Sequence, residues 1–328
     1  MEKLKQQNCI CRIRLLHLRS TNYLPSASSY PLIKSFDISM NNFKIVLFSD
    51  IDDTIAISHI VDNGKTILEW LKFKLQWFGH GFIHVDHLAG MDYLYQQLQG
   101  HGIDIFYISG MPKWVNKATH GGASSFLRKC GFPSVENLVL RENSKIETKA
   151  FKVSSIAKIL KERYLNHFKP DEFLCLLVGD NGEKDIEVYH EIEQQFPQLT
   201  FITYIHKLYE GNPALPLLPN QQLYITPAEL ALQLYRLNLG IITEAEVKII
   251  YHEVEIGLGI DKTVSKIGGH LEELIGQYLS IPNWADITPA DLARVKAILT
   301  DPKLAGTALD GTDVYQAIEK RVETMKND

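Results

Sequence analysis

Short apolar runs that alternate with segments of helical periodicity constrain the fold of this chain more than any other feature. Uninterrupted apolar runs of this length are typical of strands buried on both faces of a parallel sheet. The runs lie at 43–48, 103–108, 138–140, 173–178 and 201–205, and the helical segments between them at 88–98, 114–129, 152–163 and 184–195. The alternation predicts an α/β fold with a parallel sheet and right-handed crossovers.

The two ends of the chain differ from this central part. Residues 1–40 are basic and contain many Ser, Tyr and Pro, so we expect a loosely structured extension or an added edge strand. The Pro-rich segment 211–219, which begins with Gly211, is interpreted as a linker. After it, Thr226, Thr243 and Thr288 each stand three residues before a carboxylate, which is a helix-start signature. We therefore expect one α/β domain over 41–235 and a mostly helical region over 236–328.

Composition and charge exclude several classes of protein. The chain of 328 residues has a net charge of −5 and shows no basic stripe with interleaved aromatic residues, so nucleic acid is a poor candidate partner. Its 4 cysteines lack zinc spacing and are best explained as reduced thiols in a reducing compartment. No uncharged apolar run reaches the roughly 18 residues of a membrane span. We expect a soluble, cytoplasmic protein and leave open delivery by a signal-less secretion route.

Polar residues follow the predicted strands at the points where these strands end. Asp50 ends the first strand and Asp52 comes two residues later; Ser109 ends the second; Asp180 ends the fourth and is followed by Asp185. Ligands of open α/β sheets bind at the carboxyl ends of the strands. Carboxylates that meet there repel each other unless a cation joins them, and an all-oxygen site suits Mg²⁺.

This arrangement favours phosphoryl transfer through a covalent intermediate. Asp50, at the tip of its strand, can attack phosphorus and form an aspartyl-phosphate. Asp52 can protonate the leaving oxygen and later deprotonate a water molecule, a contribution of about 10²–10⁴-fold. Ser109 can donate its hydroxyl to a phosphoryl oxygen, and a lysine that reaches the site would stabilise the transferred group.

The same residues carry a resemblance to a known superfamily. The segment Ser49–Thr54, the strand-final Ser109, a lysine before a helix and the segment Gly179–Asp185 resemble the four motifs of the haloacid dehalogenase (HAD) superfamily. The chain resembles the catalytic domain of the actin-patch phosphatidate phosphatase family more closely still. That resemblance extends over about 43–210 and rests on the segments 49–54, 107–114, 131–133 and 179–189.

The resemblance implies a Rossmann-like HAD core with a small cap insertion at about 55–87 and a role for each motif residue. Asp50 would be the nucleophile and a metal ligand, and Asp52 the acid and base, with its backbone carbonyl on the metal. Asp180 would bind the metal directly, and Asp185 directly or through water. Independently of the resemblance, we expect Ser109, Gly110 and Lys113 to contact substrate; Gly110 departs from the family pattern, and the charge of Lys113 would attract an anionic substrate.

Some positions leave alternatives open. Both Lys149 and Lys152 stand before the apolar helix face that contains Ile156, and we favour Lys152 because the family pattern places an isoleucine four residues after its lysine. Lys113 and Trp114 fit the pocket border and the open surface about equally well. His80, His84 and His87 share a spacing that one helical face would align, but the glycines around His80 favour a surface or cap role.

The resemblance also implies a bulky substrate presented from outside, because sparse insertions above the site usually accompany such substrates in HAD-like phosphatases. Our leading hypothesis is a phosphatidate-phosphatase-like enzyme that acts on a phosphorylated lipid, with peripheral membrane contact and no transmembrane segment. The first alternative is a protein phosphatase that acts on a phosphoprotein. The second is a catalytically idle binding module.

Overall fold

The computed structural model describes residues 44–56, 87–118, 122–182, 184–207, 217–218, 220–264 and 287–327. All of them belong to one compact unit that spans Lys34–Asp328. The predictions for residues 1–40, for the interior of the cap and for most of the linker lie outside the described residues. The two ends of the predicted cap are described, and they meet, since Ala56 forms an antiparallel bridge with His87.

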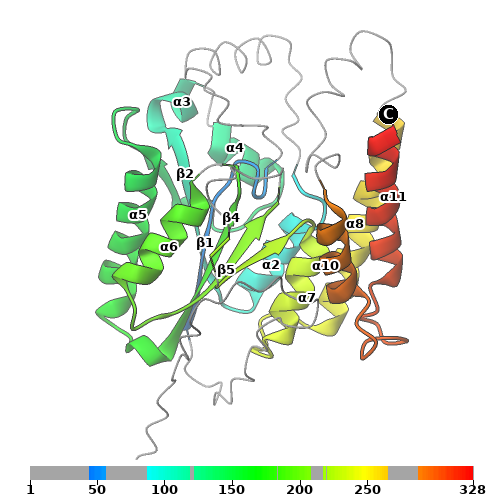
Figure 1. Ribbon diagram of the computed structural model, residues 1–328. Helices are drawn as coiled ribbons and strands as arrows, with labels where there is room; N and C mark the ends of the chain where they lie inside the picture. Colours follow the sequence, from blue (N-terminus) through cyan, green and yellow to red (C-terminus); the bar gives the residue numbers. More distant parts are fainter. Residues whose placement is uncertain are drawn as a thin grey trace, which may run out of the picture. The chain divides into compact units, whose positions relative to one another are not determined.

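A six-stranded parallel sheet forms the centre of the described chain, in the order β3-β2-β1-β4-β5-β6 (Figure 1). The strands are β1 (Lys44–Ser49), β2 (Asp104–Pro112), β3 (Leu138–Arg141), β4 (Phe173–Asp180), β5 (Thr200–His206) and β6 (Gln221–Tyr224). The predicted α/β class, with its parallel sheet, is confirmed. All eight residues of β4 are buried, as the apolar run predicted.

The edge strand β6 was not predicted. Its sequence, Gln-Gln-Leu-Tyr, is too short and too polar to be recognised as a buried strand. It pairs in parallel with β5, from Thr203 opposite Gln221 to His206 opposite Tyr224. Only this long-range pairing identifies it as a strand.

Helices cover both faces of the sheet (Figure 1). On one face, α5 (Thr148–Ile159) and α6 (Asp185–Gln195) pack against a cluster of buried side chains that includes Phe48, Phe106 and Leu177. On the other face, the cluster includes side chains from α2 (Met91–Gly100), α4 (Gly122–Lys129) and α7 (Pro227–Arg236). The predicted helix at 114–129 is two elements, α3 (Lys113–Ala118) and α4, in keeping with the two glycines at 121–122, which disfavour a continuous helix.

The described part of the C-terminal region is helical, as expected, and contributes to the same core. Its helices are α8 (Glu244–Val264), α10 (Pro289–Leu299) and α11 (Thr312–Asn327). Val247, Leu299 and Ile318, one from each helix, are fully buried in the cluster that also contains residues of β1 and β2. The domain boundaries at 40/41 and 235/236 stay predictions.

The predicted helix starts at Thr226 and Thr288 are capping boxes. Each threonine pairs with the carboxylate three residues later, Glu229 and Asp291 respectively. Asp291 also accepts a hydrogen bond of 2.6 Å from Nζ of Lys207, which directly follows β5. This buried ion pair attaches the start of α10 to the carboxyl edge of the sheet.

Candidate active site

Three carboxylates meet at the carboxyl edge of the sheet, where β1 and β4 end. One oxygen from each of Asp50, Asp180 and Asp185 lies within 4.8 Å of the others. All three residues are buried. Asp50 directly follows β1, Asp180 ends β4, and Asp185 begins α6, so the parallel pairing of β1 with β4 brings them together.

Among the residues that the structure describes, one buried lysine lies between these carboxylates. Nζ of Lys152 is 2.8 Å from Oδ1 of Asp50 and 2.6 Å from Oδ1 of Asp185. Lys149, one turn earlier in α5, instead forms an ion pair of 2.9 Å with Glu191 and is about one-third exposed, with a relative side-chain accessibility of 34%. The geometry therefore favours Lys152 over Lys149 as the lysine of the third motif.

The charges of this cluster are suited to a divalent cation. The three carboxylates are opposed by the one ammonium group of Lys152, which leaves two negative charges in excess when all four are ionised. Buried like charges at this separation are costly unless a cation neutralises them. Because every candidate ligand is a carboxylate oxygen, the site fits a hard cation such as Mg²⁺.

Backbone and hydroxyl groups orient Asp180 and Asp185. The hydroxyl of Thr54 donates to Oδ2 of Asp180 at 3.2 Å, and the backbone N–H of Gly182 donates to Oδ1 at 2.5 Å. Gly179 allows Asp185 to approach the strand, because a Cβ atom at position 179 would lie 2.6 Å from Cβ of Asp185. The Gly-Asp pair that ends β4 is therefore a requirement of packing as well as of chemistry.

The loop after β1 is held by contacts that the sequence did not indicate. The Tyr95 hydroxyl donates to Ser49 Oγ at 2.8 Å, and the Ser49 hydroxyl donates to the backbone carbonyl of Asp50 at 2.6 Å. Nδ1 of His206, at the end of β5, lies 2.7 Å from the carbonyl of Asp53, which has a left-handed φ of 56°. Tyr95 and His206 belong to separate helical and strand segments, so only their meeting in space reveals this support.

The part of the chain that contains this site matches a known protein family. Residues 45–207 match the family described as "Phosphatidate phosphatase APP1, catalytic domain". Residues 45–207 belong to that family. The resemblance identified in the sequence is confirmed, and the chain is a phosphoric monoester hydrolase.

The other comparisons add little. No curated protein matches the chain. A class C acid phosphatase from Bacillus anthracis, solved with tungstate bound, shares 18% sequence identity over 64% of this chain and 78% of its own, with a TM-score of 0.28. A score that low carries no argument about this site. None of the helices that the structure describes is both long enough and apolar enough to span a membrane.

Within residues 45–207, the remaining predicted residues of the site have different surroundings. Ser109 is buried near the end of β2, and its Oγ accepts a hydrogen bond of 3.1 Å from the Met111 backbone. A Cβ atom at Gly110 would lie 2.7 Å from Thr148 Cγ2, so this position needs a glycine for close packing on the start of α5. Asp52 is half-buried in the loop after β1 and forms a parallel β-bridge with Ala56.

Lys113 and Trp114 lie on the surface of the protein. Lys113 forms an ion pair with Glu142, and both side chains are more than half exposed. Trp114 is 43% exposed. Of the three histidines, His80 and His84 lie outside the described residues, whereas His87 forms an ion pair of 3.1 Å with Asp92. Substrate contact by Lys113 and Gly110 stays a prediction.

Proposed function

We propose that this chain is a Mg²⁺-dependent phosphatase that hydrolyses the phosphomonoester of a lipid of the phosphatidate type through an aspartyl-phosphate on Asp50. The observation that carries this proposal is the contact of Lys152 with both Asp50 and Asp185 inside a buried carboxylate cluster. The family match supplies the lipid class and gives no support to a phosphoprotein substrate.

The metal ligands of the proposal are the side chains of Asp50, Asp180 and Asp185 and the backbone carbonyl of Asp52, with Asp185 acting directly or through water. Bound Mg²⁺ would supply positive charge that stabilises the phosphoryl oxygens and the nucleophile together. Lys152 would contribute a second positive charge at the same place. Preorganised charges of this kind act strongly where water is excluded.

Asp50 and Asp52 perform the two chemical steps. In the first, an oxygen of Asp50 forms a bond to phosphorus while the bond from phosphorus to the lipid oxygen breaks, and Asp52 donates a proton to that oxygen. In the second, Asp52 accepts a proton from water, the water oxygen bonds to phosphorus, and the bond from phosphorus to Asp50 breaks. Inorganic phosphate and the two original carboxyl groups result. Ser109 would donate to a phosphoryl oxygen in both steps.

The test compares the wild-type chain with Asp50→Asn in the presence of Mg²⁺. We expect the wild type to release phosphate from p-nitrophenyl phosphate and from phosphatidate vesicles, and the variant to lose roughly 10⁴-fold or more of that activity. Asp171→Asn is the matched control, because Asp171 is an exposed carboxylate just before the amino end of β4.

Two outcomes would contradict the proposal. Equal rates of phosphate release by the wild type and Asp50→Asn would show that Asp50 is not the nucleophile. Release of phosphate from phosphopeptides, without release from phosphatidate vesicles, would remove the lipid substrate.

A further inference from the structure

Two large hydrophobic side chains are exposed beside the catalytic edge of the sheet. Trp114, in α3 after β2, is 43% exposed, and Ile146, in the loop after β3, is 38% exposed. Because β2 and β3 are parallel to β1, the segments that follow them lie at the edge where Asp50 stands. The other two large hydrophobic residues that are exposed in the described chain, Ile249 and Ile256, lie on α8.

The two segments that carry Trp114 and Ile146 are joined to each other. Lys113 forms an ion pair with Glu142 across them. Nη1 of Arg141 donates to the carbonyl of Ile146 at 2.8 Å and to the Thr148 hydroxyl at 3.1 Å. These contacts fix the loop after β3 against the start of α3 and the start of α5. Trp114 and Ile146 are therefore exposed on segments that are fixed by hydrogen bonds and an ion pair.

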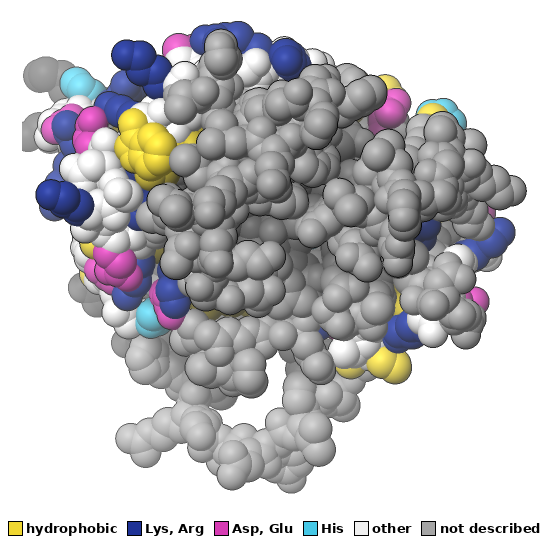
Figure 2. Space-filling view, turned by 90° about the horizontal axis from the view of Figure 1, so that it is seen from above, with side chains coloured by type: hydrophobic (Ala, Val, Ile, Leu, Met, Phe, Trp, Pro, Cys, Tyr) yellow, Lys and Arg dark blue, Asp and Glu magenta, His cyan; other side chains and the backbone are white. Residues whose placement is uncertain are grey.

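Exposed lysines accompany the two hydrophobic side chains, although the whole chain has a net charge of −5. Of the five basic residues in 113–118 and 141–149, Arg141 is buried, Lys113 pairs with Glu142 and Lys149 pairs with Glu191. Lys117 and Lys145 are both exposed. Figure 2 views the molecule from above and shows a group of hydrophobic side chains at the rim of the described part, with Lys, Arg, Asp and Glu side chains nearby.

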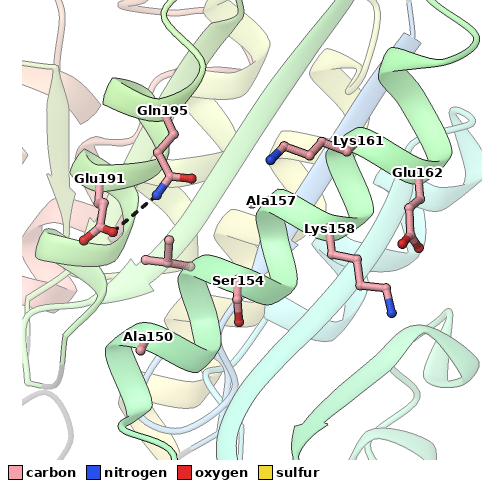
Figure 3. Close-up of a pocket in the computed structure, with 9 residues that line it drawn as sticks. Ala150, Ser154, Ala157, Lys158, Lys161, Glu162, Glu191 and Gln195 are labelled. Carbon is pink, nitrogen blue, oxygen red and sulfur yellow. Dashed lines mark hydrogen bonds between the residues drawn. The ribbon is translucent and has the colours of Figure 1, made fainter.

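A groove between α5 and α6 is a second feature of the surface (Figure 3). It has a volume of about 540 Å³ and is lined by Lys158 and Lys161 together with Glu162 and Glu191. Its charges are mixed, its lining is mostly short or polar, and no residue of the catalytic cluster reaches it. The groove therefore indicates no occupant. Its lysines can serve as controls for substitutions of Lys117 and Lys145.

We propose that Trp114, Lys117, Lys145 and Ile146, here called the edge patch, dock on the surface of an anionic lipid bilayer. Tryptophan is favoured at the boundary between water and lipid, and lysines near an anionic bilayer strengthen binding. A bilayer held at this surface would present a lipid phosphate to the edge that carries Asp50. The inference rests on the proposed function and extends it by assigning the membrane-binding surface.

The first experiment measures sedimentation of the full chain with phosphatidylcholine vesicles that contain or lack phosphatidylserine, an anionic lipid that is not the proposed substrate. We expect the wild type to bind the anionic vesicles more strongly. Trp114→Ala and Ile146→Ser should each weaken that binding, roughly tenfold for the tryptophan. The matched controls Ile249→Ser and Ile256→Ser, which change equally exposed isoleucines on α8, should bind as the wild type does.

The second experiment tests the charges. Lys117→Gln and Lys145→Gln should each weaken binding to anionic vesicles about fivefold. Lys158→Gln, in the groove of Figure 3, is the matched control and should have no effect. Equal binding of the wild type to neutral and anionic vesicles would overturn the proposal, as would edge-patch variants that bind like the wild type, or binding of phosphopeptides that depends on the edge patch.

Hydrolysis of p-nitrophenyl phosphate separates this inference from the proposed function. Trp114→Ala should keep the wild-type rate with this soluble substrate and lose rate only with phosphatidate vesicles. A chain that hydrolyses p-nitrophenyl phosphate, but whose edge-patch variants hydrolyse vesicles normally, would overturn the edge patch and keep the chemistry. A chain that lacks phosphatase activity but still binds anionic vesicles through the edge patch would overturn the proposed chemistry and keep the edge patch.

Discussion

The catalytic edge of the sheet and the face covered by the C-terminal helices are built from opposite materials. The edge buries Asp50, Asp180, Asp185 and Lys152, whose ionised forms are costly to remove from water. The helical face buries apolar side chains such as Leu299 of α10, and burial of this kind is the main source of stability. The difference teaches that the groups for catalysis and the main source of stability lie in separate regions. Substitutions on the helical face should therefore lower stability without lowering activity.

The largest effect should come from the lysine at the catalytic edge. Lys152→Met leaves three buried carboxylates without their ammonium partner, and loss of one member of a buried pair costs about 3–5 kcal/mol. We expect loss of phosphatase activity and a lower free energy of unfolding, measured by urea denaturation without metal. Lys149→Met is the matched control and should change stability by no more than about 1 kcal/mol, since its ion pair with Glu191 is partly exposed. Equal effects of the two substitutions would contradict the assignment of Lys152.

A comparable loss of stability, without loss of activity, should follow from Leu299→Ala on the helical face. Leu299 is fully buried, and leucine-to-alanine substitutions in protein cores cost about 2–5 kcal/mol. Urea denaturation should show this cost, while kcat for p-nitrophenyl phosphate at a temperature below unfolding should stay at the wild-type value. The exposed Ile249→Ala on α8 serves as the control. Unchanged stability would show that α10 is not part of the cooperative core.

Mg²⁺ should stabilise the catalytic edge specifically. A ligand that binds only the folded chain adds about 2.7 kcal/mol when it is present at 100 times its Kd. We expect Mg²⁺ to raise the Tm of the wild type and EDTA to reverse the rise, with a much smaller rise for Asp180→Asn. Leu299→Ala should keep the full rise, because its site is intact. A rise that is the same in Asp180→Asn would place the metal elsewhere.

The smallest effect concerns the ion pair that connects the two regions, Lys207 with Asp291. Burial alone would raise the pKa of Asp291, but hydrogen bonds from Lys207 and Thr288 outweigh it and lower the pKa below its usual value. A lowered pKa contributes stability above the usual value of about 3.9 and loses it as the pH falls through the folded value.

Asp291→Asn should therefore cost about 1–3 kcal/mol at pH 7. The difference between the wild type and the variant should shrink below about pH 4, as measured by urea denaturation across pH. The control is Asp313→Asn, an exposed carboxylate near the start of α11. A difference that does not depend on pH would show that packing, rather than charge, connects α10 to the sheet.

Much of the fold could be predicted because its signals are local. The apolar runs of β1, β2, β4 and β5 and the capping boxes at Thr226 and Thr288 each lie within a few consecutive residues. The edge strand β6 escaped prediction because an edge strand needs few apolar residues and is defined by its partner. The separation of α3 from α4 was missed although the sequence carries a local signal for it, the two glycines at 121–122, which disfavour a helix.

The candidate site shows the same division. Asp50, Asp180 and Asp185 were predicted because they follow apolar strands, and the parallel pairing of those strands brings them together. Tyr95 and His206, which support the loop after β1, left no signal because their contacts are with backbone and hydroxyl groups of distant segments. The chemical roles of the site residues stay predictions that the variants above test.

The sequence by itself determined the α/β class, the family and the carboxylates of the site, because each depends on residues that are close together in the chain. The sequence favoured Lys152 over Lys149, but only the tertiary structure places Lys152 among the carboxylates and Lys149 outside them. The two stand one helical turn apart in α5, about 4.5 Å along its axis, and the packing of that helix directs one to Glu191 and the other into the carboxylate cluster. It also decided that the C-terminal helices complete one face of the core, because side chains more than 200 residues apart, such as Leu47 and Leu299, must share one apolar cluster.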